Sequence, residues 1–405
     1  MRRRAFLGTA AAALGARRGG VAAPRVTPGL ERLVLDSRAP LRGRRVGLLC
    51  HAASVTADGR HAIDALRAAG ARVERLFGPE HGLRGQAAAG EKVTGGTDPA
   101  TGLPVVSLYG ERNKPAPGDL RGLEALVVDL QDAGVRFYTY ASTMLLSLEA
   151  AAEAGVEVIV LDRPNPLGGE RAEGPERDAT MPFSMVSMAP GPLVHGLTLG
   201  EMARFANERR AKPGVVSVVA MGGWSRDMTW VDTGLPWVNP SPNLRSSEAA
   251  LVYAGSCLVE ATNASEGRGT DAPFLRVGAP WVKSDELARD AATPGFALEP
   301  TTFTPTASAS APQPKLKDEA CRGVRVRVTD AATASPFRLG LRLVVALRRQ
   351  PGFAWVREGA WLDSLTGTKA VRAAIERGDS VDAILAAEAP AIERWRAERK
   401  ASLLY

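Results

Sequence analysis

The sequence predicts an α/β protein in which a Rossmann-like parallel sheet domain is followed by a smaller α+β domain, with an active-site cleft between the two. Two observations lead to this fold. Short, continuous apolar segments alternate with helical segments from residue 40 to residue 245, which is typical of parallel strands buried on both faces. The chain then passes through a segment rich in Pro, Ser, Thr and Ala, and resumes with one more strand and several helices.

The first domain is expected to contain six strands and at least three helices. The helices are expected over 58–70, 139–155 and 198–210, of which the first two end in glycine. No G-x-G-x-x-G motif follows the first strand, so a dinucleotide is not implied and we predict no cofactor. The six strands are expected at 44–50, 71–77, 103–109, 123–130, 156–162 and 214–221.

The remaining chain is divided by composition. Residues 40–245 form the Rossmann-like domain, and residues 246–318 are expected to be a cleft loop and a connecting segment. The stretch TPTASASAPQP is the most linker-like part of that segment. Residues 319–405 are expected to form the C-terminal α+β domain, which starts with the strand at 323–330.

Residues 1–23 are typical of a twin-arginine signal peptide. Arg2, Arg3 and Arg4 precede an apolar, Ala-rich run that is too short to span a bilayer. The alternative is a disordered basic tail. No other stretch approaches 18 consecutive apolar residues, so we expect a mature protein without a membrane span. We expect this protein to be exported to the periplasm or the cell exterior.

Composition excludes several other classes of protein. The net charge is +7, but the arginines are scattered and no basic run interleaves with aromatic residues, which argues against a nucleic-acid partner. The 3 cysteines are far apart and the 4 histidines form no cluster, so no metal site is predicted. Nothing in the sequence indicates an oligomeric state.

Polar residues gather where the predicted strands end. Because the carboxyl ends of parallel strands lie along one edge of a sheet, these side chains are expected to form a ligand site together. Glu80 is the strongest candidate, since it stands on a turn of Gly78 and Pro79 where no helix begins for it to cap. The other candidates at strand ends and in two later loops are His81, Arg84, Asp129, Gln131, Asp132, Arg136, Tyr138, Tyr140, Asp162, Arg163, Asn165, Asn239, Asn243, Glu266 and Arg268.

Each candidate also has a purely structural interpretation. Asp129 and Asp162 are equally suited to cap helices or bind loop amides. His81 either contacts a ligand or orients Glu80. The arginines are equally suited to ion pairs with neighbouring carboxylates, and the tyrosines are more often found in a core.

Six motifs of this chain carry a resemblance to a known family. They are FGPEHGLRG, SLYGERNKP, DLQDAGVRFYTY, LDRPNPLGG, NPSPNLRS and SEGRGTDAPF. With these motifs the chain resembles the exo-β-N-acetylmuramidases of bacterial peptidoglycan recycling, a family formerly catalogued as a domain of unknown function. The resemblance extends from about residue 44 to the terminal LLY. It implies hydrolysis of the β-1,4 bond that releases N-acetylmuramic acid from the non-reducing end of wall fragments, and Glu80 matches the family's favoured catalytic residue.

This chemistry assigns expected roles to the candidates. A glycosidase needs an acid for the leaving oxygen, which we expect to be Glu80, and a second group at the oxocarbenium-like centre. For the second group we expect Asp132 first, then Glu266 and Asp129, or the 2-acetamido group of the substrate itself. The lactyl carboxylate of the substrate requires a cation, for which the candidates are Arg136, Arg84 and Arg268.

Two other classes of function stay open at this point. The chain is also compatible with a non-catalytic sugar- or peptidoglycan-binding protein on a Rossmann-like scaffold, although a binding protein does not need a glutamate at a strand end. An enzyme that handles phosphoryl groups or nucleotides is less favoured, because no glycine-rich phosphate loop follows the first strand.

Overall fold

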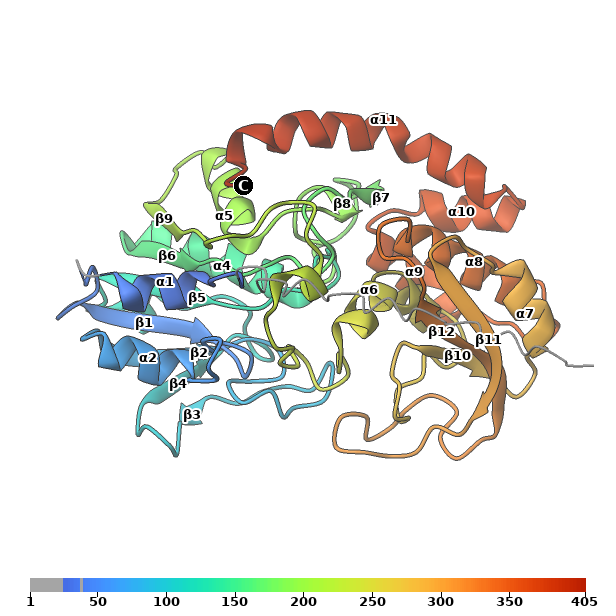
Figure 1. Cartoon of the computed structure of the whole chain (residues 1–405), viewed down its shortest axis with the longest axis horizontal. Coiled ribbons are helices and arrows are strands. Elements are labelled where there is room, and N and C mark those ends of the chain that lie inside the picture. Colours follow the sequence, from blue (N-terminus) through green and yellow to red (C-terminus); the bar gives the residue numbers. More distant parts are fainter. Residues whose placement is uncertain (1–24, 37–38) are drawn as a thin grey trace, which may run out of the picture.

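The first domain is organised around a seven-stranded sheet, and the predicted fold class is confirmed (Figure 1). The computed structural model describes residues 25–36 and 39–405, so the expected signal peptide lies outside the described residues. All strand pairs in this sheet are parallel except β3 with β4. In spatial order the strands are β3 (Gly96–Thr97), β4 (Pro104–Ser107), β2 (Arg72–Gly78), β1 (Arg45–Cys50), β5 (Ala125–Asp129), β6 (Glu157–Leu161) and β9 (Val216–Val219).

Helices cover both faces of this sheet. Successive residues of a strand point to opposite faces, so Val127 of β5 packs in one apolar cluster and Val128 in another. The first cluster includes Leu30 and Ile63, and the second includes Met144. This double burial explains the continuous apolar sequence of the strands. The helices of the first domain are α1 (Gly29–Leu35), α2 (Ala62–Ala68), α3 (Pro117–Leu120), α4 (Thr139–Ala154) and α5 (Leu199–Glu208).

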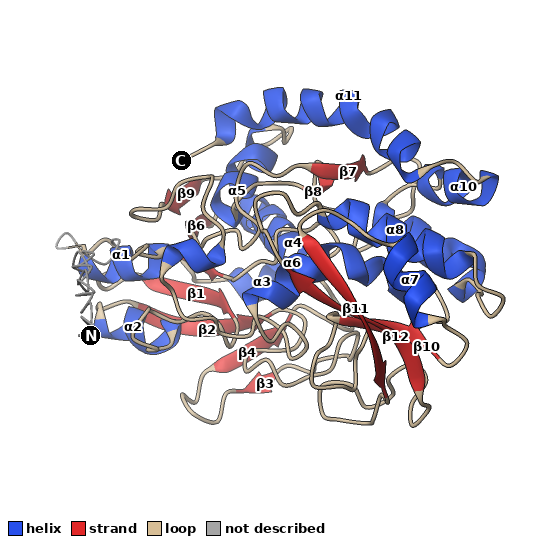
Figure 2. Ribbon diagram, turned by 45° about the vertical axis from the view of Figure 1, so that its right-hand side comes forward, coloured by secondary structure: helices blue, strands red, loops and turns tan. Residues whose placement is uncertain are grey.

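The second domain has a three-stranded antiparallel sheet in the order β10-β12-β11 (Figure 2). Its helices α6 and α8 touch so closely that a Cβ added at Gly255 would lie 1.9 Å from the carbonyl oxygen of Pro336. The elements are α6 (Ser247–Ser256), η2 (Cys257–Ala261), β10 (Arg276–Ala279), α7 (Ser284–Asp290), β11 (Phe296–Phe303), β12 (Cys321–Val328), α8 (Pro336–Arg348), η3 (Val356–Gly359), α9 (Ala360–Thr366) and α10 (Ala370–Arg377).

The structure differs here from the expected domain boundaries. Residues 246–318, expected to be a cleft loop and a connecting segment, contain α6, β10, α7 and β11. Strand β11 was concealed by its composition, since it contains Pro300 and two threonines. A proline is tolerated because β11 is an edge strand, where a residue without an N–H loses little.

The C-terminal helix α11 (Val381–Arg399) runs along the top of the molecule over both domains (Figure 1). Its indole Trp395 Nε1 donates to the carbonyl oxygen of His195 (2.9 Å), and Arg399 donates to those of His195 (3.0 Å) and Gly196 (2.7 Å). The chain then turns through η4 (Lys400–Ser402) into the first domain. Smaller elements of the first domain are β7 (Glu173–Glu176), β8 (Pro192–Val194) and η1 (Trp230–Thr233).

No helix among the described residues is both long and apolar enough to cross a membrane. In the same part of the chain, no group of three or more His, Cys, Asp or Glu side chains is arranged to hold a metal ion.

Arg136 joins the two domains in the interior. It is fully buried, and its guanidinium donates to the carbonyl oxygens of Pro175 (2.9 Å) and Gly191 (2.7 Å). A third bond reaches the carbonyl of Thr366, at the end of α9 in the second domain. Burial lowers the pKa of this guanidinium to about 10, which still leaves it charged near neutral pH. Arg136 therefore stabilises the domain junction through three backbone groups.

We predict that Arg136→Ala destabilises the protein by about 3 kcal/mol or more, because three buried carbonyls lose a charged donor. Chemical denaturation of wild type and variant measures the change. The control is Arg394→Ala, which removes a 61% exposed side chain 3.6 Å from Glu176 and should cost about 1 kcal/mol or less. Equal stability losses in the two variants would contradict the role of Arg136.

Candidate active site

A cleft of about 800 Å³ lies between the two domains. This volume falls in the range of about 300–1,000 Å³ that is usual for ligand sites. The first domain contributes residues that follow β2, β4 and β5, and the second contributes η2, the loops around 266 and 312, and η3 with the start of α9. The principal polar and aromatic lining residues are Glu80, His81, Glu91, Tyr109, Tyr138, Thr139, Asn243, Tyr253, Glu260, Glu266, Arg268, Lys315, Arg357 and Trp361.

Glu80 lies two residues after β2 and faces this cleft. The chain leaves the strand in a tight turn, in which His81 (φ 67°) and Gly82 (φ 73°) have left-handed backbone conformations. Both carboxylate oxygens of Glu80 are held: Oε1 accepts the N–H of Gly90 (2.8 Å) and Oε2 accepts the hydroxyl of Thr139 (2.7 Å). Only 9% of the residue is exposed. The carboxyl group is therefore fixed in one orientation at the cleft wall.

Aromatic and imidazole side chains enclose Glu80. Burial, together with the Glu80 carboxylate, raises the pKa of the Tyr109 hydroxyl. Burial lowers the pKa of His81 despite the neighbouring Glu80, and the Nδ1 of His81 lies 2.8 Å from the carbonyl oxygen of Ala87. Tyr140 donates to the carbonyl of Glu80 (3.2 Å) and to that of Pro240 (2.8 Å), so it supports the turn from behind. Tyr109 and His81 thus remain neutral near neutral pH.

The second domain places a charged cluster on the cleft wall. Arg268 donates to Glu260 (2.5 Å) and to Glu266 (2.9 Å). Lys315 lies 3.2 Å from the other oxygen of Glu266 and donates to four backbone carbonyls between Val259 and Ala264. Burial would raise the pKa of Glu266, but Lys315 and Arg268 together lower it to about 2. Glu266 is therefore ionised throughout the ordinary pH range.

Six of the predicted site residues line the cleft. In addition to Glu80, His81, Glu266 and Arg268, they include Tyr138 and Asn243. The Oδ1 of Asn243 is buried and has no hydrogen-bond partner among the described residues. The amide nitrogen of Asn243 donates to the carbonyl of Ser310 (2.9 Å).

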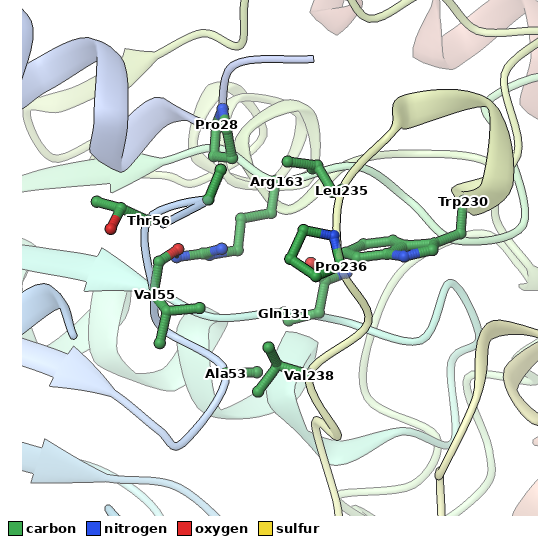
Figure 3. Close-up of a pocket in the computed structure, with 11 residues that line it drawn as sticks. Pro28, Ala53, Val55, Thr56, Gln131, Arg163, Trp230, Leu235, Pro236 and Val238 are labelled. Carbon is green, nitrogen blue, oxygen red and sulfur yellow. The ribbon is translucent and has the colours of Figure 1, made fainter. Parts of the chain in front are cut away.

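The predicted residues at the ends of β5 and β6 lie outside the cleft. Two of them, Gln131 and Arg163, line the crevice between β1 and β5, where the strand order reverses and where ligands bind in many α/β sheets. Here Trp230, Pro236 and Val238 cover the crevice and leave about 20 Å³, room for about one water molecule (Figure 3). Asp129 and Arg163 form a buried ion pair in this region, with distances of 2.5 and 2.8 Å.

The neighbouring polar residues form internal bonds. Gln131 donates to the carbonyls of Asp132 (3.0 Å) and Pro164 (2.9 Å). Asp132 accepts the N–H of Gly134 (2.7 Å), and its second oxygen is buried without a hydrogen-bond partner. Asp132 does not belong to the residues that line the cleft. Asn165 donates to the carbonyl of Leu197 (3.0 Å).

Asp162 has a structural role at the start of α5. It accepts bonds from Thr198 (2.6 Å), the N–H of Gly200 (2.8 Å) and the hydroxyl of Tyr405 (2.8 Å). Burial raises the pKa of Asp162 to about 6, although these three bonds act in the opposite direction. The sequence left open whether Asp162 binds a ligand or caps a helix. In the structure its carboxylate binds the first residues of α5, as a helix cap does.

The predicted cations other than Arg268 are also placed away from the cleft. Arg84 binds both oxygens of Asp98 at 2.9 Å. The guanidinium of Arg136 donates to three backbone carbonyls at the domain junction, so it does not reach the cleft. Asn239 is exposed and does not line the cleft either.

Several lining residues were not among the sequence candidates. Thr139 and Tyr109 lie inside two of the quoted motifs, so the motifs were the available signal. Lys315 directly follows the stretch TPTASASAPQP, which resembles a linker, so its sequence context offered no reason to choose it. Trp361 and Arg357 belong to no motif, and only the fold brings them to the cleft.

Comparison with known proteins agrees with this arrangement. Family models described as "Exo-beta-N-acetylmuramidase NamZ", N-terminal and C-terminal, match residues 46–248 and 251–405. The chain is 39% identical over 388 residues to the peptidoglycan beta-N-acetylmuramidase NamZ of Bacillus subtilis (strain 168), covering 94% of this chain and 92% of that protein. It is also similar to crystal structures of two DUF1343 family proteins from Bacteroides fragilis NCTC 9343. The first has a TM-score of 0.83 at 32% sequence identity, and the second has a TM-score of 0.75 at 29% identity. Each match covers 94% of this chain and 99% of the other chain. The chain therefore belongs to the exo-β-N-acetylmuramidase NamZ family.

Proposed function

We propose that the protein is an exo-acting glycosidase that hydrolyses the β-1,4 bond after a non-reducing terminal N-acetylmuramic acid of peptidoglycan fragments. The family membership supports the reaction, and the relative from Bacillus subtilis is named a peptidoglycan beta-N-acetylmuramidase. The observation that carries the proposal is Glu80, a carboxyl group held in one orientation at the wall of an 800 Å³ cleft.

In this proposal Glu80 is the general acid that protonates the leaving glycosidic oxygen. Its neighbours suit that role because Thr139 and the N–H of Gly90 are neutral hydrogen-bond partners, and no cation is paired with Glu80 among the described residues. A general acid must lie within hydrogen-bond reach of the oxygen that it protonates, and the fixed orientation of Glu80 at the cleft wall meets this requirement. Thr139 orients the group, since its hydroxyl can donate to the carboxylate or accept from the acid.

Glu266 is our candidate for the group that stabilises the oxocarbenium-like centre. It lines the cleft and is ionised, because Lys315 and Arg268 lower its pKa to about 2. The same ion pairs make it a weak base, so we assign it an electrostatic role and not proton transfer. Asp132, the partner first expected from the sequence, lies outside the lining and is not part of this proposal.

We predict that Glu80→Gln lowers turnover about 10²- to 10⁴-fold. The glutamine oxygen can still accept from Gly90 and its amide can donate to Thr139, so folding should be preserved, but it cannot supply the proton. The assay incubates purified protein with wall-derived disaccharides that carry N-acetylmuramic acid at the non-reducing end and measures free N-acetylmuramic acid.

The matched control for this experiment is Glu74→Gln. Glu74 lies on the same strand, β2, but is exposed and distant from its carboxyl end. This variant should release N-acetylmuramic acid at the wild-type rate. A Glu80→Gln variant that matches it would contradict the acid role, and a wild-type protein that releases no N-acetylmuramic acid would contradict the proposed function.

We further predict a strong preference for the muramic substrate. N-acetylglucosamine lacks the lactyl group, so a site that pairs the lactyl carboxylate is left with an unpaired polar group, which costs about 2–4 kcal/mol. Chromogenic β-glycosides of the two sugars should therefore differ in kcat/KM by roughly 30- to 1000-fold. Equal values would indicate a general β-hexosaminidase instead.

The export route is part of the proposal and rests on Arg2, Arg3 and Arg4. Replacement of all three by lysine keeps the charge but removes the twin-arginine pattern, so we expect the precursor to stay in the cytoplasm. Cell fractionation and immunoblotting measure the distribution. The double change of Arg17 and Arg18 to lysine serves as the charge-matched control. Mature protein found outside the cytoplasm in the triple variant would argue against this route.

A further inference from the structure

The cleft contains three cations on the wall formed by the second domain, namely Arg268, Lys315 and Arg357. The charges of the first two are balanced within the wall. Arg268 is paired with Glu260 and Glu266, and Lys315 is paired with Glu266 and with backbone carbonyls. Neither cation is available to a substrate anion without giving up a partner, which removes most of the gain from binding.

Arg357 differs from these two cations because its charge is unpaired. In the described part of the chain, its guanidinium has neither an ion pair nor a hydrogen bond, and the residue is exposed to the cleft. The guanidinium lies over Trp361, whose ring centroid is 5.6 Å from the guanidinium carbon. Trp361 in turn donates from Nε1 to Glu260 (3.4 Å), which connects it to the charged cluster. The aromatic ring supports the face of the guanidinium and leaves its N–H groups free.

The backbone at Arg357 has an unusual conformation that separates two opposite charges. Arg357 (φ 50°), Glu358 (φ 52°) and Gly359 (φ 86°) are three consecutive left-handed residues. Only the glycine adopts this region without strain, and strained backbone of this kind is concentrated at functional sites. Arg357 lines the cleft, whereas Glu358 does not, and the two neighbours form no ion pair. The turn thus presents a positive charge to the cleft and keeps the adjacent carboxylate away from it.

We propose that Arg357 binds the carboxylate of the substrate's lactyl group and thereby determines the preference for muramic acid. This inference rests on the proposed function and assigns a residue to its specificity. A guanidinium donates two parallel hydrogen bonds to a carboxylate, which gives both affinity and orientation. Arg357 therefore takes the role that the sequence suggested for Arg136, Arg84 or Arg268.

The test compares two substrates that differ only at the lactyl group. One is a chromogenic β-glycoside of N-acetylmuramic acid, and the other carries a lactyl carboxamide in place of the carboxylate. Wild type should favour the acid by roughly 30- to 1000-fold in kcat/KM. Arg357→Ala should lose most of this preference through slower hydrolysis of the acid, with little change on the amide. Arg357→Lys, which keeps the charge but not the paired donors, should give an intermediate ratio.

Glu358→Ala is the control for the strained backbone. It keeps a non-glycine residue in the same left-handed turn and should retain the wild-type ratio between the two substrates. An unchanged ratio in Arg357→Ala, with wild-type activity on the acid, would overturn this inference and leave the proposed function intact. A wild-type protein that cleaves neither glycoside and releases no N-acetylmuramic acid from wall disaccharides would overturn both.

Discussion

The position of the cleft depends on buried cations that bind backbone carbonyl groups where the two domains meet. Arg136 bridges loops of the first domain to the end of α9, and Arg399 fixes α11 on the carbonyls of His195 and Gly196. Within the second domain, the half-buried Lys315 binds four carbonyls in and just after η2. Carbonyls at helix ends and in loops lack partners of their own, so a single cation can satisfy several of them and fix segments that are distant in sequence. The bonds of Arg136 and Arg399 therefore join the domain that carries Glu80 to the domain that carries Glu266.

The sheet could be predicted from the sequence because its strands are buried on both faces and therefore read as continuous apolar runs. The importance of Glu80 could be predicted for a similar reason, since it follows a strand on a turn of Gly78 and Pro79. The sequence could not predict which strand ends face an open cleft and which are covered by another part of the chain. Asp129 and Arg163 occupy the usual ligand crevice of such a sheet, but Trp230 and its neighbours cover it. That covering depends on tertiary packing of a loop about 100 residues away in sequence.

The arginines show a second limit of sequence reasoning. Arg84, Arg136 and Arg357 are the same residue type, but the fold gives each a different partner. Arg84 binds Asp98, Arg136 binds backbone carbonyls, and Arg357 faces the cleft without an ion pair. A motif records that an arginine is present and not which acceptor the fold brings to it. Arg357 is also preceded by no recognisable turn residue, so its left-handed conformation is set by tertiary packing and not by local preference. The edge strand β11 was missed for a related reason, because its pairing with β12 overrides the local signal of Pro300.

The bond between Tyr405 and Asp162 has a consequence for the order of folding. Asp162 lies in the first domain, but one of its three hydrogen bonds comes from residue 405, and the N–H of Leu404 donates to Glu201 nearby (3.0 Å). During synthesis, which proceeds from the N-terminus, the last strand of the sheet ends at Val219, about 185 residues before these partners. Until the C-terminus is made, the Asp162 carboxylate therefore lacks one of the three donors that it has in the complete chain.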